Sequence, residues 1–197
     1  MALAEQSADR QARLVGLTGS LRLGSYSTAI LRVLQSQLDA GVTLEIVVPR
    51  LPLFDEDESG AEALDAVRRF KAALAAADGL VICTPEYNHG VPGVLKNALD
   101  WASRPSGKSA LRDKPVMAIS NSPAFTGGVR AQAQLNETLL AAHAAIAPGR
   151  QVVIGGVADK FRDGHPVDLA HFALALAAVQ AFANRCRQDK PTRTFAC

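Results

Sequence analysis

Short continuous apolar runs alternate along this chain with segments in which apolar residues recur every three or four positions. Continuous runs rich in Val, Ile and Leu are typical of strands buried on both faces of a sheet, and they lie at residues 13–18, 42–48, 80–83, 115–120 and 151–154. The wider spacing is typical of helices with one buried face, and it covers residues 30–38, 61–77, 94–101, 130–146 and 167–186. This alternation predicts a parallel sheet with helices on both faces.

The number of strand–helix units restricts the order of the strands. Right-handed crossovers leave two common orders, and five units fit the order 2-1-3-4-5 better than the six-stranded dinucleotide-binding order. In that order the chain reverses between strands one and three, so the loops after Thr18 and Cys83 form a crevice at the carboxyl edge of the sheet. We therefore expect a single α/β domain, residues 1–197 with a core of about 13–187, and a ligand site in that crevice.

The first of these loops, residues 19–28 and called the first loop below, has the composition of a phosphate site. Gly19 and Gly24 let a ligand approach the backbone closely, and Arg22 carries a charge suited to phosphate oxygens. Side-chain hydroxyls add further donors, from Ser20, Ser25, Ser27 and Thr28. The predicted helix that follows would point its unpaired amides at the same place. Helix capping by Ser25 or Ser27, with Arg22 solvated, is the alternative interpretation.

The sequence of the first loop indicates which class of phosphate ligand it can bind. There is no GK[ST] sequence, and so no lysine placed for a β- or γ-phosphate as in a Walker A loop. There is no GxGxxG fingerprint either, which disfavours NAD as the resident ligand. A single monophosphate fits this loop better than a pyrophosphate.

The second loop, residues 84–90 and called the central loop below, has special chemistry for its length. Pro85 and Pro92 restrict its backbone, Tyr87 offers a flat aromatic face, and Gly90 permits close backbone approach. A surface loop whose polar side chains satisfy local turn bonds is the alternative interpretation. The position of this loop beside the first loop at the predicted crevice favours a functional site.

Composition excludes several classes of protein. Hydrophobic residues make up 48% and charged residues 20% of the chain, as in an ordinary globular protein. A net charge of +2 without a Lys/Arg cluster argues against a nucleic-acid-binding protein. No apolar run approaches the length needed to span a membrane, and the N-terminus lacks the apolar segment of a signal peptide. We expect neither nucleic acid nor membrane as a partner.

The cysteines indicate a reducing compartment. The chain has three cysteines, an odd count, at scattered positions: Cys83, Cys186 and Cys197. None is spaced from another Cys or His as the ligands of a zinc site are. Free thiols are typical of reducing compartments. We therefore expect a cytoplasmic protein without a structural metal.

The motifs of the two loops resemble the NADPH-dependent FMN reductase family of flavodoxin-like proteins, which includes quinone, chromate and azo-dye reductases. The first loop matches with GSLRxxS at residues 19–25, and the central loop with TPEYN at residues 84–88, followed by PGxLKNALDW at residues 92–101. The order of predicted elements agrees from about Arg13 to Arg187. The resemblance implies a flavodoxin-like three-layer sandwich with a five-stranded parallel sheet in the order 2-1-3-4-5.

The resemblance also implies a binding site for FMN. The phosphate would lie on four residues of the first loop, Ser20, Arg22, Ser25 and Ser27. The isoalloxazine ring would be lined, mainly through backbone groups and the tyrosine side chain, by Pro85, Glu86, Tyr87 and Asn88. Residues 121–128, called the distal loop below, would close the far side, with Ser120 or Ser122 near the flavin. One departure is Ser27, a shorter donor where the family often has asparagine.

The activity implied by the resemblance is that of an FMN-dependent NAD(P)H oxidoreductase. NADPH or NADH would supply hydride, and a small-molecule acceptor such as a quinone, flavin, azo compound or chromate would take the electrons. Because a flavin carries the reactive chemistry, we predict no catalytic side chain. A homodimer or homotetramer with sites near the subunit interface is implied as well. Two alternatives stay open: a flavodoxin-type electron carrier, which the net charge of +2 disfavours, and a flavin-binding sensor without turnover.

Overall fold

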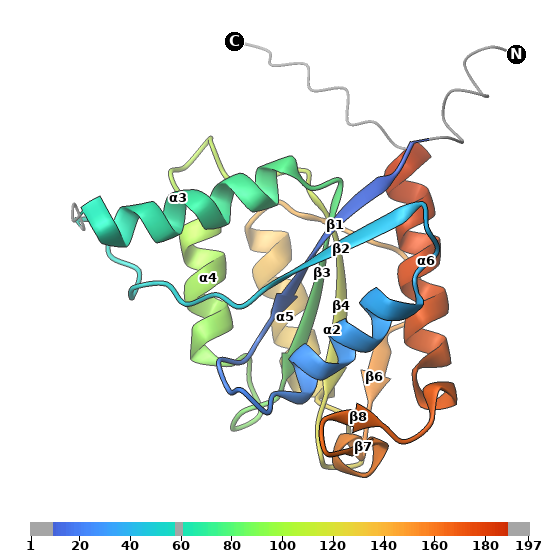
Figure 1. The fold of residues 1–197 in the computed structure, drawn as a ribbon. Coiled ribbons are helices and arrows are strands. Elements are labelled where there is room, and N and C mark those ends of the chain that lie inside the picture. The colour runs from blue at the N-terminus through green and yellow to red at the C-terminus, as the bar shows by residue number, and fades with distance from the viewer. Residues whose placement is uncertain (1–9, 58–60, 189–197) are drawn as a thin grey trace, which may run out of the picture.

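A computed structural model describes residues 10–57 and 61–188 and contains a parallel sheet at its centre (Figure 1). Its strands, from one edge to the other, are β2 (Val42–Val47), β1 (Ala12–Thr18), β3 (Gly79–Pro85) and β4 (Pro115–Asn121), with β5 (Ala145–Ile146) and β6 (Val152–Ile154) both paired to β4. The predicted order 2-1-3-4-5 is confirmed, with the fifth position shared by two short strands.

Helices cover both faces of this sheet. They are α2 (Tyr26–Gln37), α3 (Ala61–Ala76), α4 (Gly93–Ser103), α5 (Val129–Ala141) and α6 (Ala173–Gln188). One hydrophobic cluster joins α2 and α6 to the sheet, and a second joins α3, α4 and α5 to its other face. The result is the expected three-layer flavodoxin-like sandwich (Figure 1).

Strand position explains the burial pattern along each strand. β3 lies between β1 and β4, and its residues from Gly79 to Thr84 are all buried, as a strand covered on both faces requires. β2 lies at the edge, and its burial alternates at Val42, Thr43, Leu44 and Glu45. The carboxyl ends of β1 and β3 therefore lie side by side in the interior of the sheet, where the first and central loops begin.

Two predicted helix boundaries are wrong. The helix predicted to reach residue 146 ends at Ala141, and His143 adopts a positive φ of 59°. The chain then returns to the sheet, because Ala145 N–H donates to the Lys114 carbonyl at 2.9 Å and Ala147 N–H donates to the Val116 carbonyl at 2.8 Å. The last helix, predicted from residue 167, is preceded by a separate 3-10 turn at Leu169–Phe172.

An antiparallel hairpin that the sequence did not predict supports the start of α2. It consists of β7 (Phe161–Arg162) and β8 (His165–Pro166). The Phe161 ring lies with its centroid 5.8 Å from that of Tyr26, the first residue of α2, and 5.2 Å from that of Phe172. These tilted aromatic contacts pack the hairpin against the end of α2 at the first loop.

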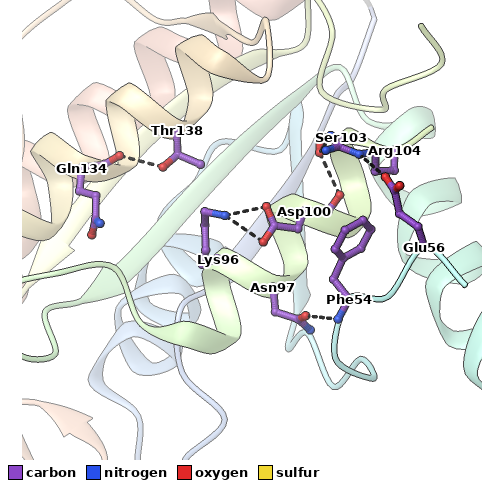
Figure 2. A network of polar contacts seen from close by, with 9 residues as sticks. All are labelled: Phe54, Glu56, Lys96, Asn97, Asp100, Ser103, Arg104, Gln134 and Thr138. Carbon is purple, nitrogen blue, oxygen red and sulfur yellow. Dashed lines mark hydrogen bonds and ion pairs between the residues drawn. The ribbon is translucent and has the colours of Figure 1, made fainter. Parts of the chain in front are cut away.

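The connector after β2 is fastened to α4 (Figure 2). Asn97 accepts a hydrogen bond from the Phe54 N–H at 2.7 Å, and the Phe54 ring packs edge-on against Trp101 with centroids 5.0 Å apart. Arg104 Nε donates to the Glu56 carboxylate at 2.8 Å. Trp101 is therefore a packing residue that holds the connector along the outer side of α4.

One helical stretch of the described chain, Leu169–Gln188, has the length and apolar character of a membrane span. In this fold it packs on the sheet. Val179, Phe182 and Ala183 are buried in the hydrophobic cluster that also contains Leu14 of β1, so one face of this helix packs against the sheet.

Candidate functional site: the crevice between the first and central loops

The first and central loops meet where β1 and β3 end. The Gly19 N–H donates to the Cys83 carbonyl at 2.8 Å. A Cβ on Gly19 would lie 2.6 Å from Thr84 Oγ1 and 3.0 Å from Thr84 Cα, so this approach requires glycine. The buried Ser20 hydroxyl lies 3.4 Å from the Tyr87 hydroxyl. The two loops that were predicted to form a crevice are thus in direct contact.

Helix α2 starts within the first loop and presents its positive end there. Ser25 is the N-cap residue, and its hydroxyl accepts a hydrogen bond from the Thr28 N–H at 3.3 Å. Ser25 therefore caps the helix, as the capping interpretation predicts. The amides of Tyr26 and Ser27 belong to the first turn, where the helix itself supplies no acceptor. This helix end can bind an anion in addition to being capped.

Arg22 is an exposed residue of the first loop. Its guanidinium takes part in none of the ion pairs found within residues 10–57 and 61–188. Its backbone N–H donates to Ser20 Oγ at 3.3 Å, which holds the turn. Arg50 approaches the same loop and donates from Nη2 to the Leu21 carbonyl at 3.0 Å. The Arg22 side chain is therefore available to an anionic ligand.

Ser27 is turned into the protein. Its side chain is 1% exposed, and its hydroxyl oxygen accepts a hydrogen bond from Asn121 Nδ2 at 2.8 Å. The Ser27 hydroxyl is therefore committed to an internal bond, whereas its amide stays in the first turn of α2. The role of Ser27 in holding a phosphate remains a prediction.

The central loop folds into a tight two-residue turn. The Tyr87 N–H donates to the Gly90 carbonyl at 3.1 Å, and the Gly90 N–H donates to the Tyr87 carbonyl at 3.0 Å. Asn88 and His89 between them both have positive φ angles, 49° and 64°, which is the geometry of a type I′ turn. Pro85 is half-buried at the end of β3, and the Tyr87 side chain is 46% exposed. The turn thus leaves an aromatic side chain accessible next to the first loop.

Glu86 joins the central loop to helix α5. Its carboxylate accepts hydrogen bonds from the Arg130 N–H at 3.0 Å and the Ala131 N–H at 3.1 Å. Burial by itself would raise the pKa of Glu86, but the Ala131 amide, the His89 ring and the Arg130 amide together lower it. Glu86 is therefore a charged cap on the positive end of α5, and this use of its side chain was not predicted from the sequence.

His89 and Arg130 form an exposed pair beside this cap. His89 Nδ1 lies 2.6 Å from Arg130 Nη1 and 3.4 Å from Glu86 Oε1. Because a guanidinium only donates and a carboxylate only accepts, Nδ1 can serve one of these partners at a time. It accepts from Arg130 when it carries no hydrogen, and it donates to Glu86 when it carries one.

Ser120 and Ser122, of which one or the other is predicted to lie near the flavin, have different surroundings. Ser120 is fully buried, and its hydroxyl donates to Gln132 Oε1 of α5 at 3.3 Å. Ser122 is half-buried, and its hydroxyl accepts from the Ala124 N–H at 3.2 Å. The Ser122 hydroxyl is therefore used within its own loop and the Ser120 hydroxyl inside the protein, and a place for either serine near the flavin stays a prediction.

Asn121, between these serines, was not singled out in the sequence. Its side-chain amide reaches Ser27 and also donates to the Thr84 carbonyl at 3.1 Å. Cys83 Sγ lies 3.6 Å from the same nitrogen. Burial raises the pKa of Cys83 to about 12, although bonds from Ser27 and Asn121 oppose the shift, so the thiol stays protonated. The signal in the sequence was a polar amide at the end of an apolar strand.

These residues form a donor set that fits FMN. Phosphate could be held by the Arg22 guanidinium and the first-turn amides of α2, and a flat ring could pack near Tyr87. Gly19 brings the two groups together, because a side chain there would push the first loop away from Thr84. The first loop thus supplies the cationic part of this site and the central loop the aromatic part.

Comparisons with known proteins agree with this fit. A family model described as NADPH-dependent FMN reductase matches residues 12–159. An NAD(P)H-dependent FMN reductase of Pseudomonas aeruginosa is 40% identical over 129 residues, which cover 65% of this chain and 69% of that protein. A quinone reductase of Pseudomonas putida is 34% identical over 169 residues, 85% of this chain and 91% of its own length.

Among solved structures, one similar protein is the flavoenzyme FerB of Paracoccus denitrificans, described as an NAD(P)H:(acceptor) oxidoreductase. It superposes with a TM-score of 0.80 at 29% sequence identity, over 90% of this chain and 98% of that one. The chain belongs to the NADPH-dependent FMN reductase family.

Proposed function

We propose that this protein is an FMN-dependent NAD(P)H oxidoreductase that reduces a small acceptor such as a quinone, a flavin, an azo compound or chromate. Family membership supports the cofactor and the reductant, and the names of the relatives support quinones and flavins as acceptors. The observation that carries the proposal is the contact between the first and central loops, with the Ser20 and Tyr87 hydroxyls 3.4 Å apart.

The residues of the crevice would hold FMN at both ends. Arg22 and the amides that follow the Ser25 cap would bind the phosphate, and the segment from Pro85 to Asn88 would line the ring. When bound, FMN would supply the redox chemistry, that is, hydride acceptance from NAD(P)H and electron delivery to the acceptor. The chain itself binds, orients and shields, and none of its side chains has to act as a nucleophile or an acid.

Anaerobic stopped-flow mixing of the FMN-loaded protein with NADPH, and separately with NADH, tests this function. We expect rapid loss of the oxidised flavin absorbance with at least one of the two nucleotides, followed by its return when a quinone is added. A flavin spectrum unchanged by both nucleotides would contradict the proposal and favour a flavodoxin-type carrier or a flavin-binding sensor. The ratio of the two bleaching rates would show which nucleotide is preferred.

We also propose a homodimer or homotetramer with its sites near the subunit interface. Large apolar side chains are exposed around the carboxyl edge of the sheet: Leu23 at 95%, Phe125 at 92% and Leu53 at 83%. Burial of such side chains favours association. Light scattering on the FMN-loaded protein should give two or four times the chain mass of 20.8 kDa, and a single-chain mass at micromolar concentration would contradict this.

A cytoplasmic location is proposed on the cysteines. Cys83 and Cys186 are both buried and lie in separate elements, β3 and α6, as thiols of a reducing compartment can, whereas Cys197 lies outside the described residues. Cell fractionation tests the location, and recovery outside the cytoplasmic fraction would contradict it.

A further inference from the structure

Asn121, the last residue of β4, joins two elements that flank the predicted crevice, α2 and β3. It is 1% exposed, and its Nδ2 atom lies 2.8 Å from Ser27 Oγ on α2 and 3.1 Å from the Thr84 carbonyl on β3. The Thr84 carbonyl can only accept, so the atom facing it must be the amide nitrogen and not the amide oxygen. Both N–H bonds of Nδ2 are thereby used, one toward each side of the crevice.

The partners of Asn121 are at the decisive places for cofactor geometry. Ser27 is the second residue of α2, so the bond to its hydroxyl fixes the direction of the first turn and its amides. Thr84 immediately precedes the residue that ends β3, and a Cβ on Gly19 would lie 3.0 Å from the Thr84 Cα. A buried hydrogen bond holds its partners firmly, because breaking it leaves polar groups unsatisfied.

We propose that Asn121 is a positioning residue for the FMN phosphate, which acts by orienting the first turn of α2 through the Ser27 hydroxyl. In this arrangement the Ser27 backbone amide donates to the FMN phosphate, and the Ser27 hydroxyl accepts the hydrogen bond from Asn121 that orients the helix end. This inference rests on the proposed FMN-binding function.

The test compares the affinities of the apo-protein for FMN and for riboflavin, which lacks the phosphate, by fluorescence titration. Asn121→Ser is too short to reach Ser27 and Thr84 together, so FMN affinity should fall about tenfold, the loss expected for one to two net hydrogen bonds. Riboflavin affinity should change much less, so the FMN-to-riboflavin affinity ratio falls. Equal losses for both ligands, or an unchanged ratio, would overturn the proposal.

An exchange variant tests the route through Ser27. Ser27→Asn combined with Asn121→Ser puts an amide and a hydroxyl back at the same two positions with their places reversed. We expect this variant to recover a higher FMN-to-riboflavin ratio than Asn121→Ser alone. If the exchange gives no recovery, Asn121 does not act through position 27 and the proposal fails.

Gln35→Ala is a matched control. Gln35 also lies on α2 and donates from its side-chain amide to a strand carbonyl, that of Leu44, at 2.6 Å, but in the second half of the helix. This variant should unfold at a lower temperature while its FMN-to-riboflavin ratio stays that of the wild type. A wild-type protein that binds neither ligand would instead refute the proposed function itself.

Discussion

Replacing Gly19 by alanine should lower the free energy of unfolding of the apo-protein by about 1–3 kcal/mol, the usual cost of overpacking a well-packed site. The added Cβ would lie 2.6 Å from Thr84 Oγ1 and 3.0 Å from Thr84 Cα. The hydroxyl could rotate away, but the backbone atom could not, so the first loop must move away from the central loop. Urea unfolding without FMN measures this effect.

The same substitution should weaken FMN binding about tenfold, because FMN must bring the displaced loops together again. A tenfold loss of affinity corresponds to about 1.4 kcal/mol of binding free energy. Gly24→Ala is the control from the same loop, since a Cβ on Gly24 would meet nothing within 4 Å. It should leave the unfolding free energy within about 0.5 kcal/mol of wild type. Equal unfolding free energies of the Gly19→Ala and Gly24→Ala proteins would show that the space between Gly19 and Thr84 can accept a methyl group.

Replacing Arg22 by alanine should weaken FMN binding by about 10–100-fold and leave riboflavin binding nearly unchanged. A hydrogen bond to a charged group contributes about 1.5–3 kcal/mol, and riboflavin has no phosphate with which to make it. Stability of the apo-protein should be nearly unaffected, because Arg22 is exposed and makes no ion pair within the described chain. Fluorescence titration with the two ligands gives both affinities.

Lys108→Ala removes one positive charge at a different place and serves as the control for net charge. Lys108 is exposed in the loop that precedes β4. It therefore lies at the amino ends of the parallel strands, whereas the first loop lies at their carboxyl ends. Its FMN affinity should match that of the wild type at physiological salt, where screening acts within about 8 Å. If Arg22→Ala bound FMN as tightly as Lys108→Ala does, the phosphate would have to lie away from Arg22.

The central elements of the fold were predictable because their sequence signals are strong. The run LVIC in β3 is apolar without interruption, and a strand in the middle of a parallel sheet has just this property. The order of strands followed from the handedness of crossovers. The crevice followed from the order, and the motifs GSLR and PEYN fell on its two sides.

The far edge of the sheet was less predictable because its strands are very short. β5 has two residues, and its Ala-rich surroundings continue the helical spacing of α5. The helix ends at Ala141 because the Lys114 and Val116 carbonyls at the edge of β4 bind the following segment, a tertiary effect that periodicity does not contain. The β7–β8 hairpin has strands of two residues each and no alternation to detect.

Within the site, the sequence predicted which loops matter better than which way side chains turn. Tyr87 is accessible, but the Glu86 side chain caps α5 and the Ser27 hydroxyl is internal. The amide that the family pattern often places at position 27 reaches that position from Asn121 on another strand. A contact between residues so far apart in the chain depends on register, which no local motif specifies.

The cross-links between the loops restrict how this enzyme can be re-engineered. Side-chain hydrogen bonds join Ser20 to the central loop, Glu86 to α5, and Asn121 to α2. The conformation of each segment therefore depends on its neighbour. A single loop transplanted from a related enzyme would therefore lack the partners of its side-chain hydrogen bonds. Chimaeras should retain their cofactor only when three segments are transferred together: the first loop with the start of α2, the central loop, and the segment from Asn121 to the start of α5.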